Sequence, residues 1–358
     1  MIGFLTNTDS KSRNTGNYFY VNNIINFFPG KYYLKTISSF SNLNFKKKFF
    51  YFFLPFSLFL NLIYLLFYFP NKSTKKDFIL ATFSVYSKNI FLIKKHSIKT
   101  YLMIDSLFDY YYNKNKYNLI YISFAYILEL LLIFSGLKTI ILNSNKSKND
   151  FLTRYSFFLK FKKLNIKVIK VWCSKNKILK KEKKTSSKYL LLYGNFLFHP
   201  NLRGLSLFLK KIDNKINCKL IIGGTFRDNL LIKKFTEIIS KKFRNYEFVK
   251  NLSDTKLEEL INSSIAVIIV GEKCEGIKLK IVESLYNQKI VIVHKNLTEY
   301  FDNAYQNMVI YNNDNLNEKI EYTLNKKPAK DLIFMKNFSE KVRKKEIEMI
   351  LNDTIIKK

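Results

Sequence analysis

Two runs of β-branched residues in the second half of the chain constrain its fold more than any other feature. Residues 265–270 and 290–293 read Ile-Ala-Val-Ile-Ile-Val and Ile-Val-Ile-Val, a composition typical of parallel strands buried on both faces. The segment between them predicts a loop and then a helix over residues 279–286. The loop therefore falls at the carboxyl end of the first strand, where open α/β sheets bind their ligands.

This loop and the start of its helix carry side chains that suit a phosphorylated sugar. Glu275 and Gly276 stand in the loop, and Lys278, Lys280 and Glu283 follow. A helix N-terminus and lysines can face phosphate oxygens, and carboxylates accept protons from hydroxyl groups. Each side chain also has a purely structural interpretation. Glu275 would then complement the helix dipole, and Lys278 would be a surface cation. Lys280 and Glu283 would form an i,i+3 ion pair worth about 0.2–0.5 kcal/mol.

The spacing from Glu275 to Glu283 resembles the Glu-x7-Glu motif of GT-B glycosyltransferases of the family 4 type. The run that starts at Gly276 is similar to the GxGxxxKxxE version found in many cell-envelope sugar transferases. A second similarity lies at residues 191–196, Leu-Leu-Tyr-Gly-Asn-Phe, followed by His-Pro-Asn and by Gly204. It is similar to the segment that opens the family's nucleotide-binding domain. The likeness covers about residues 188–300.

The resemblance implies a role for each of these residues. Glu283 would accept hydrogen bonds from ribose hydroxyls, Lys280 would lie near the diphosphate or the donor sugar, and Glu275 would contact sugar hydroxyls at the reacting centre. Glu275 and Lys280 are thus the expected catalytic residues. The expected donor-binding residues are Glu283, Lys278, Gly276, Gly194, Asn195 and Arg203.

Gly194 and Asn195 follow the first predicted strand of the second half. A glycine at this point lets backbone N–H groups approach a phosphate closely, although a tight turn alone would also explain it. Arg203 would pair with the diphosphate. His199, in the same segment, is expected to anchor the loop rather than to transfer protons.

Strands and helices alternate twice along the chain, which predicts an α/β fold of the GT-B type with two Rossmann-like, doubly wound domains facing a cleft. The expected domains are residues 1–175 and 189–335, joined by a Lys-rich linker at 176–188. A helix within 336–358 is expected to pack back on the first domain, as the resemblance implies.

The individual elements are predicted from apolar runs and helical spacing. In the first half, strands are expected at 2–6, 32–37, 78–83, 100–104, 119–123, 139–142 and 168–172, with one helix that opens near residues 15–16 and another at 124–134. In the second half, strands are expected at 189–193, 219–222, 246–249, 266–270 and 290–293, and helices at 202–212, 229–242, 255–262 and 279–286.

The first domain would carry the acceptor side of the site. Thr15 and Gly16 lie in its first predicted βα loop, and Asp105 ends a predicted strand. Such loops reach the cleft by topology, which places Thr15, Gly16 and Asp105 among the candidate acceptor-side residues. For Asp105, capping at the edge of the core explains the position equally well.

The charge of the chain limits its partners. The 61 lysines and arginines against 27 acidic residues give a net charge of +34, for which codon bias toward Lys, Asn, Ile, Phe and Tyr is one explanation. A surface this basic attracts anionic lipid headgroups and nucleotide sugars. No RRM-like aromatic motif and no zinc-finger spacing occurs, so nucleic-acid readout is not expected.

Three widely spaced cysteines predict neither disulfides nor a zinc site, and a reducing cytoplasm fits. Residues 2–6 predict a strand rather than the start of a secretory signal.

Residues 49–69 form an uncharged, Phe- and Leu-rich segment with lysines on both sides. Its length permits a transmembrane helix, since about 20 residues span a bilayer. Pro55, Asn61 and the symmetric lysines argue against a span, and spanning would separate the preceding elements from their sheet. A buried or membrane-surface helix is therefore favoured, and a true span stays open.

The sequence thus predicts transfer of a sugar from a nucleoside-diphosphate sugar to an envelope polysaccharide, a lipid-linked saccharide or a similar acceptor. Preorganised positive groups can stabilise the departing diphosphate, so neither a metal nor a cofactor is expected, and no Asp-x-Asp pair suggests a metal. Family resemblance implies retention of anomeric configuration. We expect a cytoplasmic protein at the inner face of the cell membrane. A nucleotide-sugar-binding protein without transferase activity and a protein anchored by residues 49–69 are the alternatives.

Overall fold

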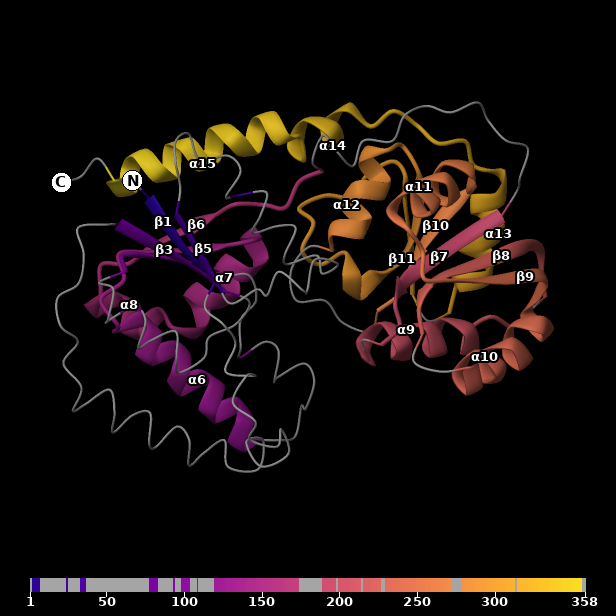
Figure 1. Ribbon diagram of the computed structural model, residues 1–358, viewed down its shortest axis with the longest axis horizontal. Helices are drawn as coiled ribbons and strands as arrows, with labels where there is room; N and C mark the ends of the chain where they lie inside the picture. The colour runs from indigo at the N-terminus through magenta and orange to yellow at the C-terminus, as the bar shows by residue number, and fades with distance from the viewer. Residues whose placement is uncertain are drawn as a thin grey trace. The chain divides into compact units, whose positions relative to one another are not determined.

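The chain divides into two compact units, Met1–Lys170 with Lys344–Lys358 and Val171–Arg343 (Figure 1). Val171 begins the second unit, whereas the first domain was expected to extend to residue 175. The computed structural model describes residues 2–6, 24, 33–36, 77–82, 93, 98–103, 108, 119–173, 189–197, 199–213, 215–226, 229–271, 278–312 and 314–355.

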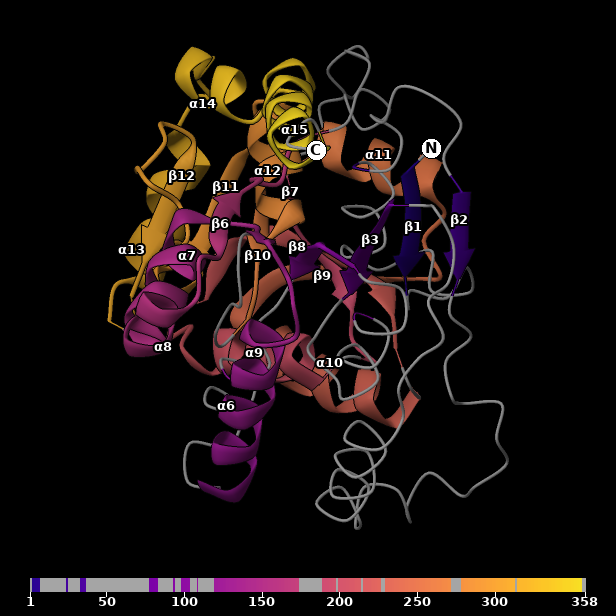
Figure 2. The same ribbon diagram turned by 90° about the vertical axis from the view of Figure 1, so that its left-hand side faces the viewer.

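Unit 1 is built on a six-stranded sheet in which neighbouring strands are parallel (Figure 2). Strand β1 lies between β2 and β3, so the chain winds outward from it in both directions. The order across the sheet is β2 (Tyr33–Thr36), β1 (Ile2–Thr6), β3 (Asp77–Thr82), β4 (Thr100–Met103), β5 (Thr139–Leu142) and β6 (Asn165–Val168).

Helices α6 (Leu119–Ile133), α7 (Asn145–Arg154) and α8 (Ser156–Phe161) accompany this sheet within Met1–Lys170. The prediction of a strand at residues 119–123 is wrong, because these residues form the first turns of α6. The run Leu-Ile-Tyr-Ile-Ser-Phe has no helical periodicity, and an apolar run of this kind is ambiguous between a buried strand and a helix. The helix ends before Gly136, whose φ of 99° is the left-handed conformation expected of a glycine there.

The core of unit 1 contains a buried polar network on α6. Glu129 is fully buried, and its carboxylate accepts hydrogen bonds from the hydroxyl of Tyr155 at 2.7 Å and from the backbone N–H of Phe108 at 3.1 Å. The guanidinium of Arg154 lies 3.6 Å from the same carboxylate and 4.0 Å from the centre of the Phe108 ring. Burial and the charge of Glu129 raise the pKa of Tyr155 above its ordinary range. The network ties α6 to the end of α7.

Unit 2 contains a second six-stranded parallel sheet, with helices on its faces (Figure 1). Its strand order is β12 (Met308–Tyr311), β11 (Ile290–His294), β10 (Ala266–Ile269), β7 (Tyr189–Asn195), β8 (Ile216–Thr225) and β9 (Phe243–Lys250). Numbered within the unit, this is the order 6-5-4-1-2-3 of a Rossmann sheet. The prediction of an α/β fold with two doubly wound sheets is therefore confirmed.

Helix predictions in unit 2 were close to the observed elements. The helices are α9 (His199–Lys210), α10 (Asn229–Lys242), α11 (Asp254–Ser263), α12 (Leu279–Tyr286), α13 (Leu316–Asn325) and α14 (Leu332–Asn337). For α10 and α12 the predicted bounds equal the observed ones, while β12, α13 and α14 were not predicted. In unit 1, β6 begins at Asn165 rather than at the predicted residue 168.

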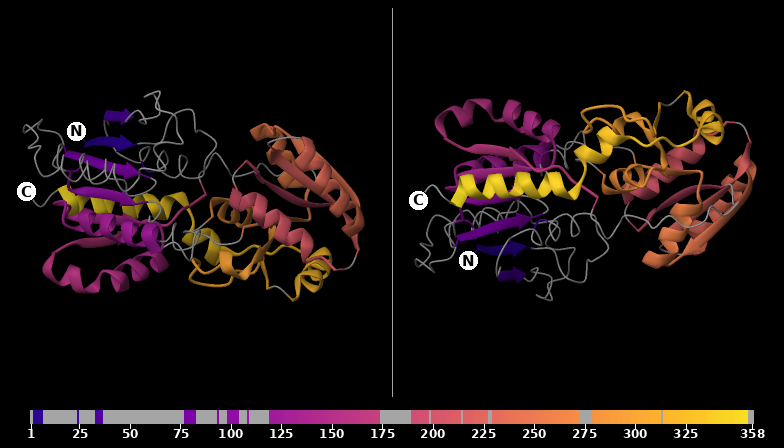
Figure 3. Two further views of the ribbon diagram at one scale, coloured as in Figure 1. Left: turned by 90° about the horizontal axis from the view of Figure 1, so that it is seen from below. Right: turned by 90° about the horizontal axis from the view of Figure 1, so that it is seen from above.

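The last helix, α15 (Glu340–Ile355), starts in unit 2 and continues through residues assigned to unit 1 (Figure 3). Residues 49–69, the linker at 176–188 and the helix expected near Thr15 lie outside the described residues. Within the described ranges, no helix has the length and apolar character needed to cross a membrane.

The polar network of unit 1 gives a first prediction. Tyr155→Phe removes one hydrogen bond from the buried carboxylate of Glu129, which should lower the free energy of unfolding by about 1–3 kcal/mol. Urea unfolding measures the change. Tyr126→Phe is the matched control, since it removes the hydroxyl of a ring that stacks on Tyr155 at 5.1 Å. Equal stability of the Tyr155→Phe variant and the wild type would mean that the hydrogen bond from Tyr155 to Glu129 contributes nothing to stability.

Candidate functional site

The carboxyl edge of the unit 2 sheet has a point at which the chain reverses its direction of winding. Strand β7 pairs with β10 on one side and with β8 on the other. Strands β7, β8 and β9 follow one another toward one edge of the sheet, and β10, β11 and β12 follow one another toward the other edge. In open α/β sheets the ligand lies outside the carboxyl ends of the strands at such a switch point. The residues that follow β7 and β10 are therefore the candidates for ligand binding.

The end of β7 is held in a defined turn that leads into α9. The side-chain oxygen of Asn195 accepts a hydrogen bond from the backbone N–H of Leu197 at 3.0 Å, as in an Asx turn. The backbone carbonyl of Asn195 accepts another from the amide of Asn201 at 2.9 Å. Phe196 N–H donates to the carbonyl of Thr225 at the end of β8. The side chain of Asn195 thus stabilises the turn after β7. This agrees with the structural explanation of the Gly194–Asn195 segment, in which the segment serves a tight turn.

Lys280 on α12 reaches back to the end of β7. Its Nζ donates a hydrogen bond to the backbone carbonyl of Tyr193 at 3.1 Å and lies 5.1 Å from the centre of the Tyr193 ring. A Cβ atom on Gly194 would come within 2.9 Å of this nitrogen, so the absence of a side chain leaves room for the amine. Lys280, predicted to be catalytic, and Gly194, predicted to bind the donor, are therefore in contact at the switch point.

The electrostatic surroundings of Lys280 are unusual for a lysine. Burial, and secondarily the positive charge of Lys278, lowers the pKa of Lys280 from its ordinary value of 10.5 to about 8, while the charge of Glu283 acts in the opposite direction. Burial together with the same carboxylate raises the pKa of Tyr193. Glu283 thus acts electrostatically on both Lys280 and Tyr193. All three side chains belong to one cluster at the end of β7.

Lys278 marks the start of α12. Its backbone carbonyl accepts the first helical hydrogen bonds, from Ile281 at 3.0 Å and from Val282 at 3.3 Å. The side chain passes Gly271, the second residue after β10, since a Cβ built there would lie 3.6 Å from Cε of Lys278. Lys278 is half-buried and belongs to the same edge of the sheet as Lys280.

Helix α9 packs tightly against the loop that follows β10. A Cβ on Gly204 would lie 2.5 Å from the backbone nitrogen of Gly271, a distance that no real side chain tolerates. The glycine therefore brings α9 up to the β10 loop. Its neighbour Arg203 is exposed on α9, and the predicted role of Arg203 at the diphosphate stays a prediction.

The described structure brings together three of the predicted donor-binding residues, Gly194, Lys278 and Glu283, with Lys280, which was predicted to be catalytic. Asn195 lies beside them as a loop-shaping residue. Sequence reasoning missed Tyr193, because it stands inside an apolar strand and reads as core. Its only signal was its place directly before Gly194. Apart from Arg203, the remaining candidates lie outside the described residues, namely Glu275, Gly276, Thr15, Gly16 and Asp105.

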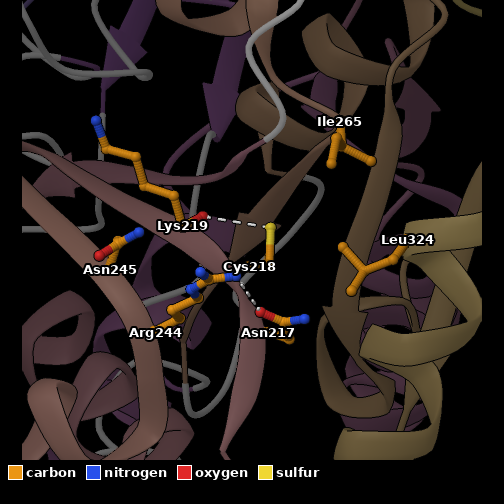
Figure 4. Close-up of a pocket in the computed structure, with 7 residues that line it drawn as sticks. All are labelled: Asn217, Cys218, Lys219, Arg244, Asn245, Ile265 and Leu324. Carbon is orange, nitrogen blue, oxygen red and sulfur yellow. Dashed lines mark hydrogen bonds between the residues drawn. The ribbon is translucent and has the colours of Figure 1, made fainter.

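A separate cavity of about 280 Å³ opens at the opposite, amino edge of the same sheet (Figure 4). Cys218 and Lys219 line it at the start of β8, and Arg244 lies at the start of β9. Arg244 donates a hydrogen bond to the side chain of Asn217 at 3.3 Å, and Lys219 pairs with Glu247 at 2.6 Å. Because the amino edge of a parallel sheet is not where such folds bind ligands, this cavity is not the candidate site.

Solved structures share this architecture over nearly the whole chain. HepE from Anabaena, solved with UDP-glucose, is 12% identical with a TM-score of 0.66 and covers 99% of this chain and 100% of its own. A glycosyltransferase from Rickettsia africae is 16% identical with a TM-score of 0.60 and covers 100% and 99%. WaaG, a glycosyltransferase involved in lipopolysaccharide biosynthesis, is 10% identical with a TM-score of 0.59 and covers 97% and 95%.

The chain has the GT-B fold. No protein family and no curated protein matches it by sequence. At these levels of identity the structural likeness establishes the fold alone. The switch point of the second sheet lies in unit 2, which also carries Lys280 and Glu283.

The lowered pKa of Lys280 gives the second prediction. The unfolded chain keeps the proton of Lys280 up to about pH 10.5, whereas the folded chain releases it near pH 8. The free energy of unfolding should therefore rise with pH between about 8 and 10.5 through this residue, and this contribution should be lost as the pH falls through 8. Lys280→Met should remove that rise.

Urea unfolding of wild type and Lys280→Met at pH 7.5 and pH 10 isolates the effect, because all other titrating groups are shared. Lys210→Met, which removes an exposed lysine from α9, is the matched control. If the stability difference between wild type and Lys280→Met is the same at both pH values, the amine of Lys280 is not desolvated.

Proposed function

We propose that this protein is a glycosyltransferase that moves a sugar from a nucleoside-diphosphate sugar to an envelope polysaccharide, a lipid-linked saccharide or a similar acceptor. The observation that carries the proposal is the contact between Lys280 and the Tyr193–Gly194 backbone at the switch point, with Glu283 one helical turn away. A cation, a side-chain-free stretch of backbone and a carboxylate meet there. They match the diphosphate and the ribose of such a donor.

The chemistry would depend on the departing diphosphate. As the anomeric bond breaks, negative charge builds on the leaving group while the sugar approaches an oxocarbenium-like state. Positive groups already aimed at that charge are the largest help an enzyme can supply. Lys280, the N-terminus of α12 and the backbone at Gly194 would fill this role without a metal.

Lys280 suits this role because its charge responds to the ligand. With a pKa of about 8 it is about nine-tenths protonated at pH 7, and an adjacent diphosphate would raise its pKa further. Glu283 would bind the ribose hydroxyls, and Lys278 and Arg203 would add positive charge near the phosphates. Glu275 would hold the donor sugar, with retention of its anomeric configuration.

The structural relatives support a sugar donor. HepE was solved with UDP and with UDP-glucose, and WaaG takes part in lipopolysaccharide biosynthesis. By analogy, the acceptor of this chain would be an envelope or lipid-linked saccharide, with Thr15, Gly16 and Asp105 on the acceptor side. The net charge of +34 favours a position at the anionic inner face of the cell membrane.

The donor site gives the third prediction. Glu283 should make charge-assisted hydrogen bonds worth roughly 1.5–3 kcal/mol, so Glu283→Ala should weaken nucleoside-diphosphate affinity by about ten- to a hundredfold. Calorimetric titration measures the dissociation constant. Glu259→Ala, which removes an exposed carboxylate paired with Lys256 on α11, is the matched control. Unaltered nucleotide affinity in Glu283→Ala would remove Glu283 from the site.

The fourth prediction separates the two interpretations of Glu275. If it only complements the helix dipole, Glu275→Gln should cost about 0.3–1 kcal/mol of stability and leave turnover nearly intact. If it holds the donor sugar in the reacting geometry, kcat should fall about tenfold or more with nucleoside-diphosphate affinity unchanged. We expect the second result. A variant with normal kcat and weakened nucleotide affinity would contradict the assigned role.

Turnover itself distinguishes a transferase from a nucleotide-sugar-binding protein. Purified protein incubated with a panel of nucleotide sugars should release free nucleoside diphosphate, slowly by donor hydrolysis and faster with an acceptor. A protein that binds a nucleotide sugar and never releases the diphosphate would be a binding protein with a GT-B fold.

A further inference from the structure

Unit 1 exposes an apolar ridge that its own core does not use. Ile120 and Ile127 on α6 and Phe134 just after it are spaced by seven residues, so they lie on one face of the helix and its extension. Their exposed fractions are 70%, 52% and 50%. On α8, Phe157 and Phe161 are exposed by 62% and 71%. We call these five residues the α6–α8 ridge.

The two parts of the ridge are continuous. The ring of Phe134 packs edge-on against Phe158 at 6.3 Å, Phe158 packs against Phe157 at 5.4 Å, and Phe157 packs against Phe161 at 5.2 Å. Figure 1 shows α8 beside one end of α6. A helix of this length extends about 22 Å, so the ridge is an extended feature rather than a single exposed side chain.

Exposed lysines lie close in sequence to the aromatic end of the ridge. Lys160 and Lys163 are exposed on and just after α8, and Lys138 is exposed just after α6. The sequence contains no acidic residue between positions 151 and 170. Exposed aromatic and aliphatic side chains next to lysines, on short helices, are the features of a surface that lies in the headgroup region of an anionic membrane.

We infer that the α6–α8 ridge is the surface through which this protein docks on an anionic lipid membrane. The charge complementarity selects this partner over a second copy of the chain, because two copies meeting at the ridge would bring their lysines together and repel one another. The inference rests on the proposed function and deepens it, since it names the surface by which a transferase would approach a lipid-linked acceptor. Binding is tested without donor or acceptor, so failure of the docking and failure of the transfer reaction are distinguishable.

The fifth prediction concerns binding to vesicles of phosphatidylcholine with phosphatidylglycerol at equal amounts. Replacing both Phe157 and Phe161 by Ser should reduce the bound fraction in co-sedimentation by about tenfold or more, since both rings leave water on binding. Replacing Lys160 and Lys163 by Gln should weaken binding several-fold at low salt and have little effect at high salt. The matched control is Leu332→Ser with Ile333→Ser, which removes two equally exposed apolar residues from α14 in unit 2.

A second measurement keeps the inference testable if the double variant folds poorly. Phe157→Trp places a fluorescent reporter on the ridge in addition to the single, buried native Trp172, and its emission should shift to the blue when anionic vesicles are added. An unshifted emission spectrum of the Phe157→Trp variant, under conditions in which the protein sediments with vesicles, would overturn the inference. So would undiminished binding of the Phe157→Ser, Phe161→Ser variant, which would place the membrane contact elsewhere. A dimer in the absence of lipid that this variant converts to monomer would identify the ridge as a self-association surface instead.

Discussion

The candidate site depends on one contact, in which the amine of Lys280 is held against the backbone at the end of β7. The hydrogen bond to the carbonyl of Tyr193 fixes the amine, and the missing side chain of Gly194 makes room for it. Strand β7 and helix α12 are distant in sequence and meet only because β7 and β10 are neighbours in the sheet. The doubly wound topology is therefore what turns two separate sequence motifs into one site.

Holding a cation in this position works against stability. Burial lowers the pKa of Lys280 because the charged form is less well solvated there than in water, and the nearby charge of Glu283 offsets only part of this effect. A desolvated charge that the fold only partly compensates is ready to bind an anion. In unit 1, by contrast, the buried charge of Glu129 has a hydroxyl, a backbone N–H and a guanidinium around it. That cluster has the character of a structural network, whereas the incomplete compensation of Lys280 is what the proposed role at a diphosphate requires.

Local patterns predicted the elements of unit 2 well and those of unit 1 less well, for physical reasons. Helix α12 has buried positions at Ile281, Val282 and Leu285, a helical spacing that flanking β-branched strands made unambiguous. Helix α6 is apolar on nearly every side, so its first turns at 119–123 read equally well as a strand. Strand β12 stands between polar residues, and only two of its four residues, Val309 and Ile310, are β-branched. The contribution of Tyr193 could not be predicted, because it arises from its carbonyl and from packing against another segment.

A lysine rather than an arginine at position 280 follows from the same geometry. The amine lies 2.9 Å from the place that a Cβ on Gly194 would occupy, and this narrow space suits a compact group on a flexible stem better than a planar guanidinium. With a pKa of about 8 the amine of Lys280 stays mostly protonated at pH 7, and an anion bound beside it would raise that pKa further. Arginine stays charged at every accessible pH, so burial could not shift its protonation in this way. The narrow space beside Gly194 is therefore the stronger reason for a lysine at this position.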